Sequence, residues 1–186
     1  MRKFKRPKRP RPTTPAPFKI YVDADACPVK QEVYRVAERY RSTVYLVSNQ
    51  PLRAPSQLGL VVKVIQVDQG ADEADRWIFE HIEADDICVT SDLPLAAKCI
   101  DKEGIAITPR GRVFNADTIA DALANRDLMT SLRETDWGGT EVPRGGPPPM
   151  TQKTRSNFLN SLDRAVQKSL KAHKLRVPKK TSSDDS

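Results

Sequence analysis

Apolar runs of strand length alternate with segments of helical periodicity along most of this 186-residue chain. The runs are rich in β-branched and aromatic residues, and the segments between them carry apolar residues at helical spacing. The predicted strands are residues 18–25, 43–49, 60–67, 86–91 and 105–109, and the predicted helices are residues 28–40, 72–83, 93–104 and 115–126. Such alternation implies right-handed βαβ units, whose strands are parallel and whose helices cover both faces of the sheet. The sequence therefore predicts an α/β fold with a mainly parallel central sheet, in three α/β/α layers.

The two ends of the chain and one late segment have compositions that do not favour regular structure. Residues 1–17 contain five prolines and seven bases, too little apolar surface to form a core. Residues 137–153 contain four glycines and four prolines, which predicts an irregular excursion before a last helix at 155–170. We therefore expect a disordered basic arm over 1–17, one α/β domain over 18–172 and a disordered tail over 173–186.

The formal net charge of +7 is concentrated in the arm. Residues 1–17 carry seven Lys and Arg and no acid, which leaves 24 bases against 24 acids in the rest of the chain. An arm of this kind attracts phosphate backbones without regard to their sequence. A solvated tail has the same composition, and the residues alone do not decide between the two readings.

Composition also excludes several classes of protein. The chain has no run of about 18 apolar residues that would span a bilayer, and no apolar segment follows the basic start, so we expect a cytoplasmic protein without a membrane segment. The cysteines are three in number and show no CxxC spacing, which indicates neither a zinc knuckle nor a disulfide framework. Two histidines are too few for a histidine cage. Any metal in this protein would be held by oxygen.

Acidic and polar residues recur where the predicted strands end. Asp23 and Asp25 end the first strand, Asn49 ends the second, and Ser91 and Asp92 follow the fourth. In an open parallel sheet, ligands bind beyond the carboxyl ends of the strands, so these side chains should share one crevice.

The helix before the fourth strand adds two more acids. Asp72 and Asp75, in the stretch GADEAD, are three residues apart and so lie on one face of a helix. Carboxylates gathered in one crevice repel one another unless a cation lies between them, and Mg²⁺ prefers oxygen ligands. The set of acids therefore predicts a divalent-metal site.

Each acid also has a purely structural interpretation. Asp72 can serve the start of its helix, Asp92 can cap the helix that begins at Leu93, and Asp25 can stabilise the turn before Pro28. Taken together, acids after two strands and on the helix between them favour a joint site. For Cys27, packing is favoured over a nucleophilic role, because no histidine lies near it in sequence.

Six ordered motifs resemble a known bacterial family. YVDADACPVK, VSNQ, GADEAD, VTSDLPLA, ITPRG and RGGPPPM, over about residues 18–170, closely resemble the uncharacterised YaiI/YqxD family (UPF0178, DUF188). That family is regarded as related to PIN-like domains, whose acids hold Mg²⁺ or Mn²⁺ in many ribonucleases. The resemblance implies that Asp23 is the acid ending the first strand, that Asp72 or Asp75 is the mid-chain acid, and that Asp92 is the aspartate of the T-x-D segment. Asp25 departs from the PIN pattern.

The resemblance implies a PIN-like fold and metal-dependent hydrolysis of nucleic-acid phosphodiesters, with RNA as the expected substrate. The catalytic acids would be Asp23, Asp72, Asp75 and Asp92. The candidate metal ligands are Asp23, Asp25, Asp72, Asp75 and Asp92. The candidate substrate-binding residues are Asn49 and Ser91, which would orient water or substrate, and Arg110, Arg112 and Arg144, which would contact phosphate.

Two other functions fit parts of the sequence. DADAC also resembles the first motif of HAD-type phosphatases, in which Asp23 would be a phosphorylated nucleophile, but the required lysine would be Lys63 within a predicted strand, and Asp92 would have no role. The second alternative is a non-catalytic module that kept the fold and binds nucleic acid or protein. The sequence does not choose between RNA and DNA or between endo- and exo-cleavage, and it does not indicate the oligomeric state.

Overall fold

The computed structural model describes residues 14–25, 27–55, 60–70, 72–134 and 148–176. Within them the chain forms one parallel sheet and five helices. The strands are β1 (Lys19–Asp23), β2 (Thr43–Ser48), β3 (Val61–Gln66), β4 (Ile87–Val89) and β5 (Ile105–Ile107). The helices are α1 (Lys30–Tyr40), α2 (Glu73–His81), α3 (Leu93–Asp101), α4 (Ala116–Glu134) and α5 (Gln152–Arg176).

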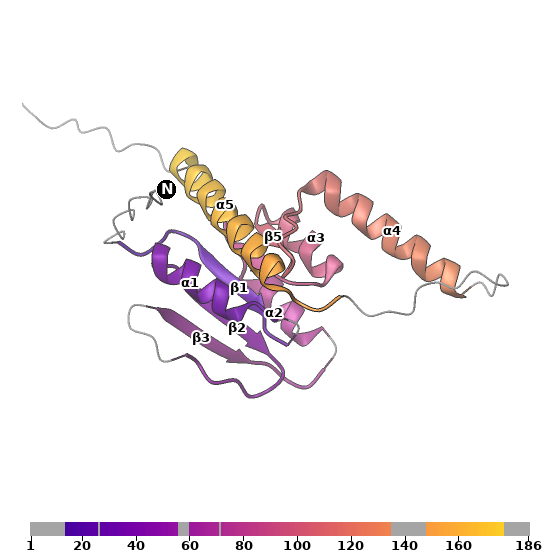
Figure 1. The fold of residues 1–186 in the computed structure, drawn as a ribbon, viewed down its shortest axis with the longest axis horizontal. Helices are drawn as coiled ribbons and strands as arrows, with labels where there is room; N and C mark the ends of the chain where they lie inside the picture. The colour runs from indigo at the N-terminus through magenta and orange to yellow at the C-terminus, as the bar shows by residue number, and fades with distance from the viewer. Residues whose placement is uncertain (1–13, 26, 56–59, 71, 135–147, 177–186) are drawn as a thin grey trace, which may run out of the picture.

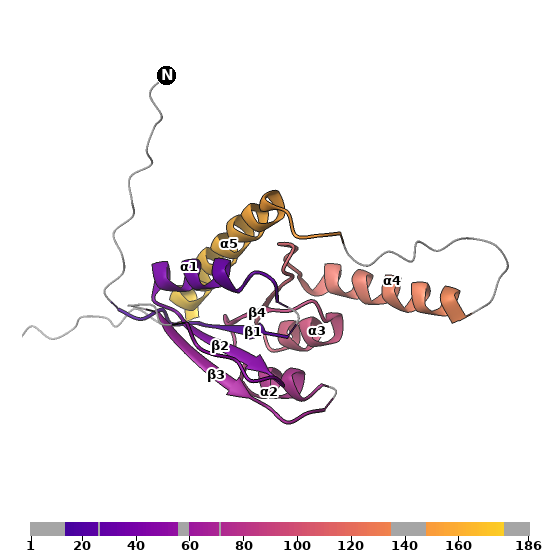
Figure 2. The same cartoon turned by 60° about the horizontal axis from the view of Figure 1, so that its bottom comes forward.

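The sheet has the strand order β3-β2-β1-β4-β5, and every neighbouring pair is parallel. From β1 the chain passes through α1 to β2 and then continues to β3. It then returns through α2 to the other side of β1, where β4 and β5 follow. This return changes the side on which the helices pack, because right-handed crossovers in opposite directions lie on opposite faces of the sheet. Figure 2 shows α1 and α5 on one face and α2 and α3 on the other.

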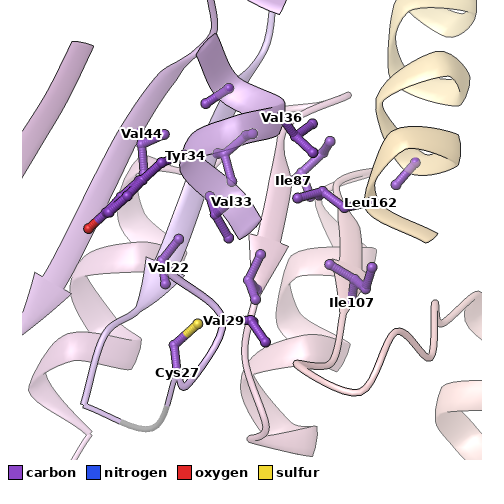
Figure 3. Close-up of a cluster of buried hydrophobic side chains, with 14 of the residues drawn as sticks. Val22, Cys27, Val29, Val33, Tyr34, Val36, Val44, Ile87, Ile107 and Leu162 are labelled. Atoms are coloured by element: carbon purple, nitrogen blue, oxygen red, sulfur yellow. The ribbon is translucent and has the colours of Figure 1, made fainter. Parts of the chain in front are cut away.

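The larger core lies between the sheet and the layer formed by α1 and α5. Val33 and Val36 of α1 and Leu162 of α5 pack there against inward side chains of the strands, such as Val22 and Ile87 (Figure 3). All five are fully buried. The spacing of Val33 and Val36 is the helical period seen in the sequence, and it aligns their side chains on one face of α1. The three-layer α/β fold predicted from the alternation of elements is therefore confirmed.

The second face of the sheet carries a smaller core. Tyr21, Val47 and Cys88, which alternate with the residues of the larger core along their strands, pack against Ile78 of α2 and Leu95 of α3. Period-two alternation thus divides each strand between two apolar layers. None of the described helices is both long and apolar enough to span a membrane.

The last two helices are longer than the sequence predicts. Asn115 caps α4 as expected, its Oδ1 accepting from Thr118 N at 2.8 Å. The helix then continues to Glu134 instead of ending at residue 126, because no glycine or proline interrupts it. Figure 1 shows α4 extending away from the sheet. α5 covers 152–176, so residues 173–176, expected in the tail, are helical.

Other boundaries shift by a few residues. Pro28, expected as the first helical residue of α1, precedes the N-cap Val29, so the helix begins at Lys30. Most of the predicted Gly/Pro excursion and most of the basic arm lie outside the described residues.

Gly111, in the loop after β5, has a φ of +87°, which L-residues with a side chain rarely adopt. A Cβ added there would lie 3.1 Å from Phe158 Cα on α5. We expect Gly111→Ala to lower the free energy of unfolding by about 1–2 kcal/mol, measured by urea denaturation. As a control, Gly70→Ala should lower it less, because Gly70 has no positive φ and its Cβ would meet the Glu73 side chain instead of backbone. Equal losses in the two variants would contradict this account.

Candidate functional site

The strand order places a crevice between β1 and β4. These neighbouring strands are paired in parallel, yet the chain leaves β1 toward β2 on one side and leaves β4 toward β5 on the other. The connections therefore diverge at the carboxyl ends of the two strands, which is where open α/β sheets bind ligands. Asp23 is the last residue of β1, and Ser91 and Asp92 follow β4 after one residue, Thr90.

An open cleft of about 430 Å³ occupies this position. Six of the predicted site residues line it, together with Gly70 and Ala74. The six are Asp23, Asn49, Asp72, Asp75, Ser91 and Asp92. The structure thus brings together side chains from the ends of β1 and β2, the start of α2 and the turn between β4 and α3.

Thr90 links the two sides of the crevice and was not predicted as a site residue. Its Oγ1 donates to Asp23 Oδ2 at 3.3 Å and accepts from Asp92 N at 3.0 Å. Thr90 is buried, so its hydroxyl fixes the carboxylate of Asp23 relative to the turn after β4. The signal for this role was present in the sequence, since Thr90 is the first residue of the T-x-D segment.

Asp92 has a structural role as well as its place in the cleft. Its Oδ1 accepts from Leu95 N at 2.7 Å and so caps the N-terminus of α3. The structural interpretation of Asp92 is therefore confirmed. This cap does not exclude a role of Asp92 as a metal ligand, because the cap uses only Oδ1 and leaves Oδ2 available.

Asp25 lies apart from the cleft lining. Ser48 Oγ donates to its Oδ1 at 2.5 Å, and Asn49 N donates to its Oδ2 at 3.0 Å. Both oxygens thus fasten the end of β2 to the turn after β1, which holds Asn49 at the cleft. The turn-stabilising interpretation of Asp25 fits this geometry better than the metal-ligand interpretation does.

The surroundings of two cleft acids, Asp75 and Asp23, disfavour their ionised forms. Burial, followed by the negative charges of Asp92, Asp23 and Asp72, raises the pKa of Asp75 to about 6. Burial also raises the pKa of Asp23; the charges of Asp25 and Asp92 add to this rise and the hydrogen bond from Thr90 opposes it. No base is among the described residues that line the cleft. The site therefore favours a cation.

The polar side-chain atoms around the cleft are all oxygens except for the amide nitrogen of Asn49. Carboxylate, amide and hydroxyl oxygens suit Mg²⁺ and Mn²⁺, so the chemistry of the donor set fits such an ion. As the side chains stand, no three Asp, Glu, His or Cys residues of the described chain are grouped closely enough to hold one ion. Asp23, Asp72, Asp75 and Asp92 are the residues that could hold it.

The predicted phosphate-binding arginines do not line the cleft. Arg110 donates to Pro148 O, and the Arg112 guanidinium lies over the Phe114 ring, 4.8 Å from its centroid. Arg144 lies outside the described residues.

Two further residues bear on the alternatives. Cys27 is buried in the larger core, and burial raises the pKa of its thiol to about 11. A thiol of this kind is a poor nucleophile, which agrees with the packing role. Lys63, which the phosphatase alternative requires, lies on β3 with its Nζ 3.3 Å from Tyr45 Oη, and it does not line the cleft.

The fold and the cleft define a class: a three-layer α/β protein with an acidic site at the switch point of a parallel sheet. A family model described as "Uncharacterized BCR, YaiI/YqxD family" (DUF188) matches residues 21–168. The chain belongs to this family, as its motifs predicted.

Curated relatives carry the same family label. A UPF0178 protein of Paramagnetospirillum magneticum is 47% identical over 148 residues, which cover 80% of this chain and 93% of that protein. A UPF0178 protein of Parvibaculum lavamentivorans is 48% identical, with the same two shares, and one of Rhodospirillum rubrum is 45% identical over 81% of this chain and 96% of its own. No solved structure matches the chain.

Proposed function

We propose that this protein is a PIN-like, divalent-metal-dependent phosphodiester hydrolase that acts on nucleic acid, with RNA as the expected substrate. One observation carries the proposal: four aspartates line a single open cleft at the switch point of the sheet, and no base is among the described residues of its lining. Carboxylates in this arrangement are costly unless they bind a cation.

The chain's own residues would divide the work as follows. Asp23, Asp72, Asp75 and Asp92 hold the Mg²⁺ or Mn²⁺. Thr90 keeps Asp23 in place through its hydrogen bond, and the bonds from Ser48 and Asn49 to Asp25 fix the turn that positions Asn49. Asn49 and Ser91, at the cleft wall, orient the attacking water or the phosphate. The bound ion would supply activation of water and neutralisation of the charge that grows on the phosphate.

The proposed partner of the basic arm is nucleic acid, and the proposed location of the protein is the cytoplasm. The basic arm adds salt-dependent attraction to nucleic acid, since it holds the whole formal excess of charge. A cytoplasmic location is supported by the three cysteines, all of them free and buried.

The experiment is a titration of the wild-type protein with Mn²⁺ or Mg²⁺, combined with a cleavage screen on structured and unstructured RNA and DNA. A metal that binds the folded state should raise its stability by about 2.7 kcal/mol at a hundredfold excess over the dissociation constant. Thermal melts in EDTA and in Mn²⁺ measure this gain. Cleavage that requires the metal supports hydrolysis.

Other results would favour other functions. Metal-dependent stabilisation with no cleavage of any nucleic acid would favour the non-catalytic binding module. A metal-fluoride complex bound to Asp23 as a mimic of a phosphoaspartate would favour the phosphatase. The absence of any metal-dependent stabilisation would remove the basis of the proposal.

A further inference from the structure

The solvent face of α5 is a strip of bases. α5 contains seven Lys and Arg residues and a single acid, Asp163, which already pairs with Arg39 of α1 at 2.7 Å. Six of the bases are exposed. Arg176 pairs with Asp85 and Glu103, and the other five form no ion pair within the part of the chain that the structure describes. They are Lys153, Arg164, Lys168, Lys171 and Lys174. At 3.6 residues per turn, the five fall within a sector of about 120°.

The opposite face of α5 belongs to the core. Phe158, Leu162, Ala165 and Val166 are buried against the sheet and α1. The apolar face of α5 thus fixes the helix on the core, and the strip lies on the face of α5 that is exposed to solvent. Figure 2 shows α5 beside α1 on one side of the sheet.

The strip begins at the edge of the sheet that holds the cleft. In the first turns of α5, Arg155 Nη1 donates to Pro28 O at 2.8 Å, just beyond the end of β1. In its last turns, Ser169 Oγ donates to Asp85 O at 2.6 Å, just before β4 begins. α5 therefore runs antiparallel to the strands, from the cleft edge to the opposite edge.

The loop after β5 lies against the first turns of α5, at the edge of the sheet that holds the cleft. An added Cβ at Gly111 would lie 3.1 Å from Phe158 Cα, so the loop is seated directly on the first turns of α5. Arg110 and Arg112 flank this glycine, and both are exposed. Their side chains add two exposed bases near the first turns of α5.

We infer that the exposed face of α5, with Arg110 and Arg112, binds the phosphate backbone of a double-helical nucleic acid and leads it toward the acidic cleft. The inference rests on the proposed function for the nature of the partner. Lys153 and Lys174 are separated by about 32 Å along the helix axis, close to the length of about 34 Å of one turn of a duplex. A straight, rigid row of Lys and Arg without acids complements a regular row of phosphates.

An anionic membrane is the main competing partner, and α5 suits it poorly. Helices that lie on membranes insert a free apolar face, whereas the apolar face of α5 is already used in the core. Leu175, at its end, is the one exposed large hydrophobic residue of α5.

Binding and chemistry can be measured apart. In EDTA the acidic cleft repels phosphate, so binding reports the strip together with the basic arm, and the loss in a strip variant reports the strip alone. Cleavage in Mn²⁺ reports the cleft. Fluorescence anisotropy with the full chain would use labelled RNA and DNA duplexes of about 20 base pairs and the matching single strands, over a series of salt concentrations. Lys168→Glu/Lys171→Glu tests the strip. Arg53→Glu/Arg126→Glu changes the net charge equally, at exposed positions off the strip.

We expect the strip variant to bind duplex about tenfold more weakly, with a salt slope reduced by about two, and the control to lose less than about twofold. Weaker binding of the strip variant to the RNA duplex or to the DNA duplex supports the inference, and the duplex that is affected identifies the ligand. Equal losses in both variants, loss for single strands only, or a wild type that binds no duplex would overturn it. So would a strip variant that loses binding only to phosphatidylglycerol vesicles.

The two proposals can fail separately. Strip-dependent binding without cleavage in Mn²⁺ keeps this inference and removes hydrolysis. Cleavage that is unaffected by the strip variant keeps hydrolysis and removes this inference.

Discussion

Asp23→Asn is expected to lower metal-dependent cleavage of nucleic acid by about a thousandfold, because stabilisation of transition-state charge by a metal is worth several kcal/mol and each 1.36 kcal/mol is tenfold in rate. The substitution keeps an acceptor for the Thr90 hydroxyl, so the fold should persist. Asp23 ends β1 and lines the cleft, so the substitution removes one of its four carboxylates. Single-turnover cleavage rates at saturating Mn²⁺ measure the loss.

Asp25→Asn is the matched control, since it removes the same charge two residues away. The Asp25 oxygens accept from Ser48 and Asn49, so Asn at this position should disturb the turn and lower the rate by less than about tenfold. Equal thousandfold losses in the two variants would show that Asp25 shares the metal. Full activity of Asp23→Asn would remove the proposed site.

Asp23 lines the cleft whereas Asp25 does not, and the sequence alone could not predict this difference. Both residues were placed at the end of the first predicted strand, so the pair was predicted to share one crevice. β1 ends at Asp23, however, and Ala24 N bonds to Val47 O at 2.8 Å as the chain turns toward β2. The turn directs Asp25 toward Ser48. A contact of this kind depends on the pairing of strands, which periodicity does not encode.

Helix ends were predictable only where a local signal marks them. Asn115 begins α4 with its own side chain, and the sequence indicated this cap. The end of α4 has no such marker, because Leu128 and Met129 continue the helix while exposed to solvent. The sequence predicted the elements and the parallel sheet, but the order of the strands emerged only from the structure.

The acids of the cleft were predictable because strand ends locate Asp23 and Asp92 and helical spacing locates Asp72 and Asp75. The shifts of their pKa values were not predictable. Asp75 is half-buried, and its pKa is raised by burial and then by three neighbouring carboxylates. Asp92 is less suitable for measuring this repulsion, because it also caps α3. Asp92→Asn keeps the cap acceptor, but Asp92→Ala should lose about 1 kcal/mol from the cap alone, with or without metal.

Asp75→Asn is therefore expected to reverse the order of stability between two conditions. In EDTA it should raise the free energy of unfolding by about 1 kcal/mol, since the charge it removes is disfavoured by its surroundings but partly screened by solvent. In Mn²⁺ at a hundredfold excess over the dissociation constant, wild type should gain about 2.7 kcal/mol and the variant much less, so wild type becomes the more stable protein. Thermal melts of both proteins in both buffers measure the reversal. If Asp75→Asn is the less stable protein in EDTA and gains as much from Mn²⁺ as wild type does, the carboxylate of Asp75 serves the fold and the cleft loses a central ligand.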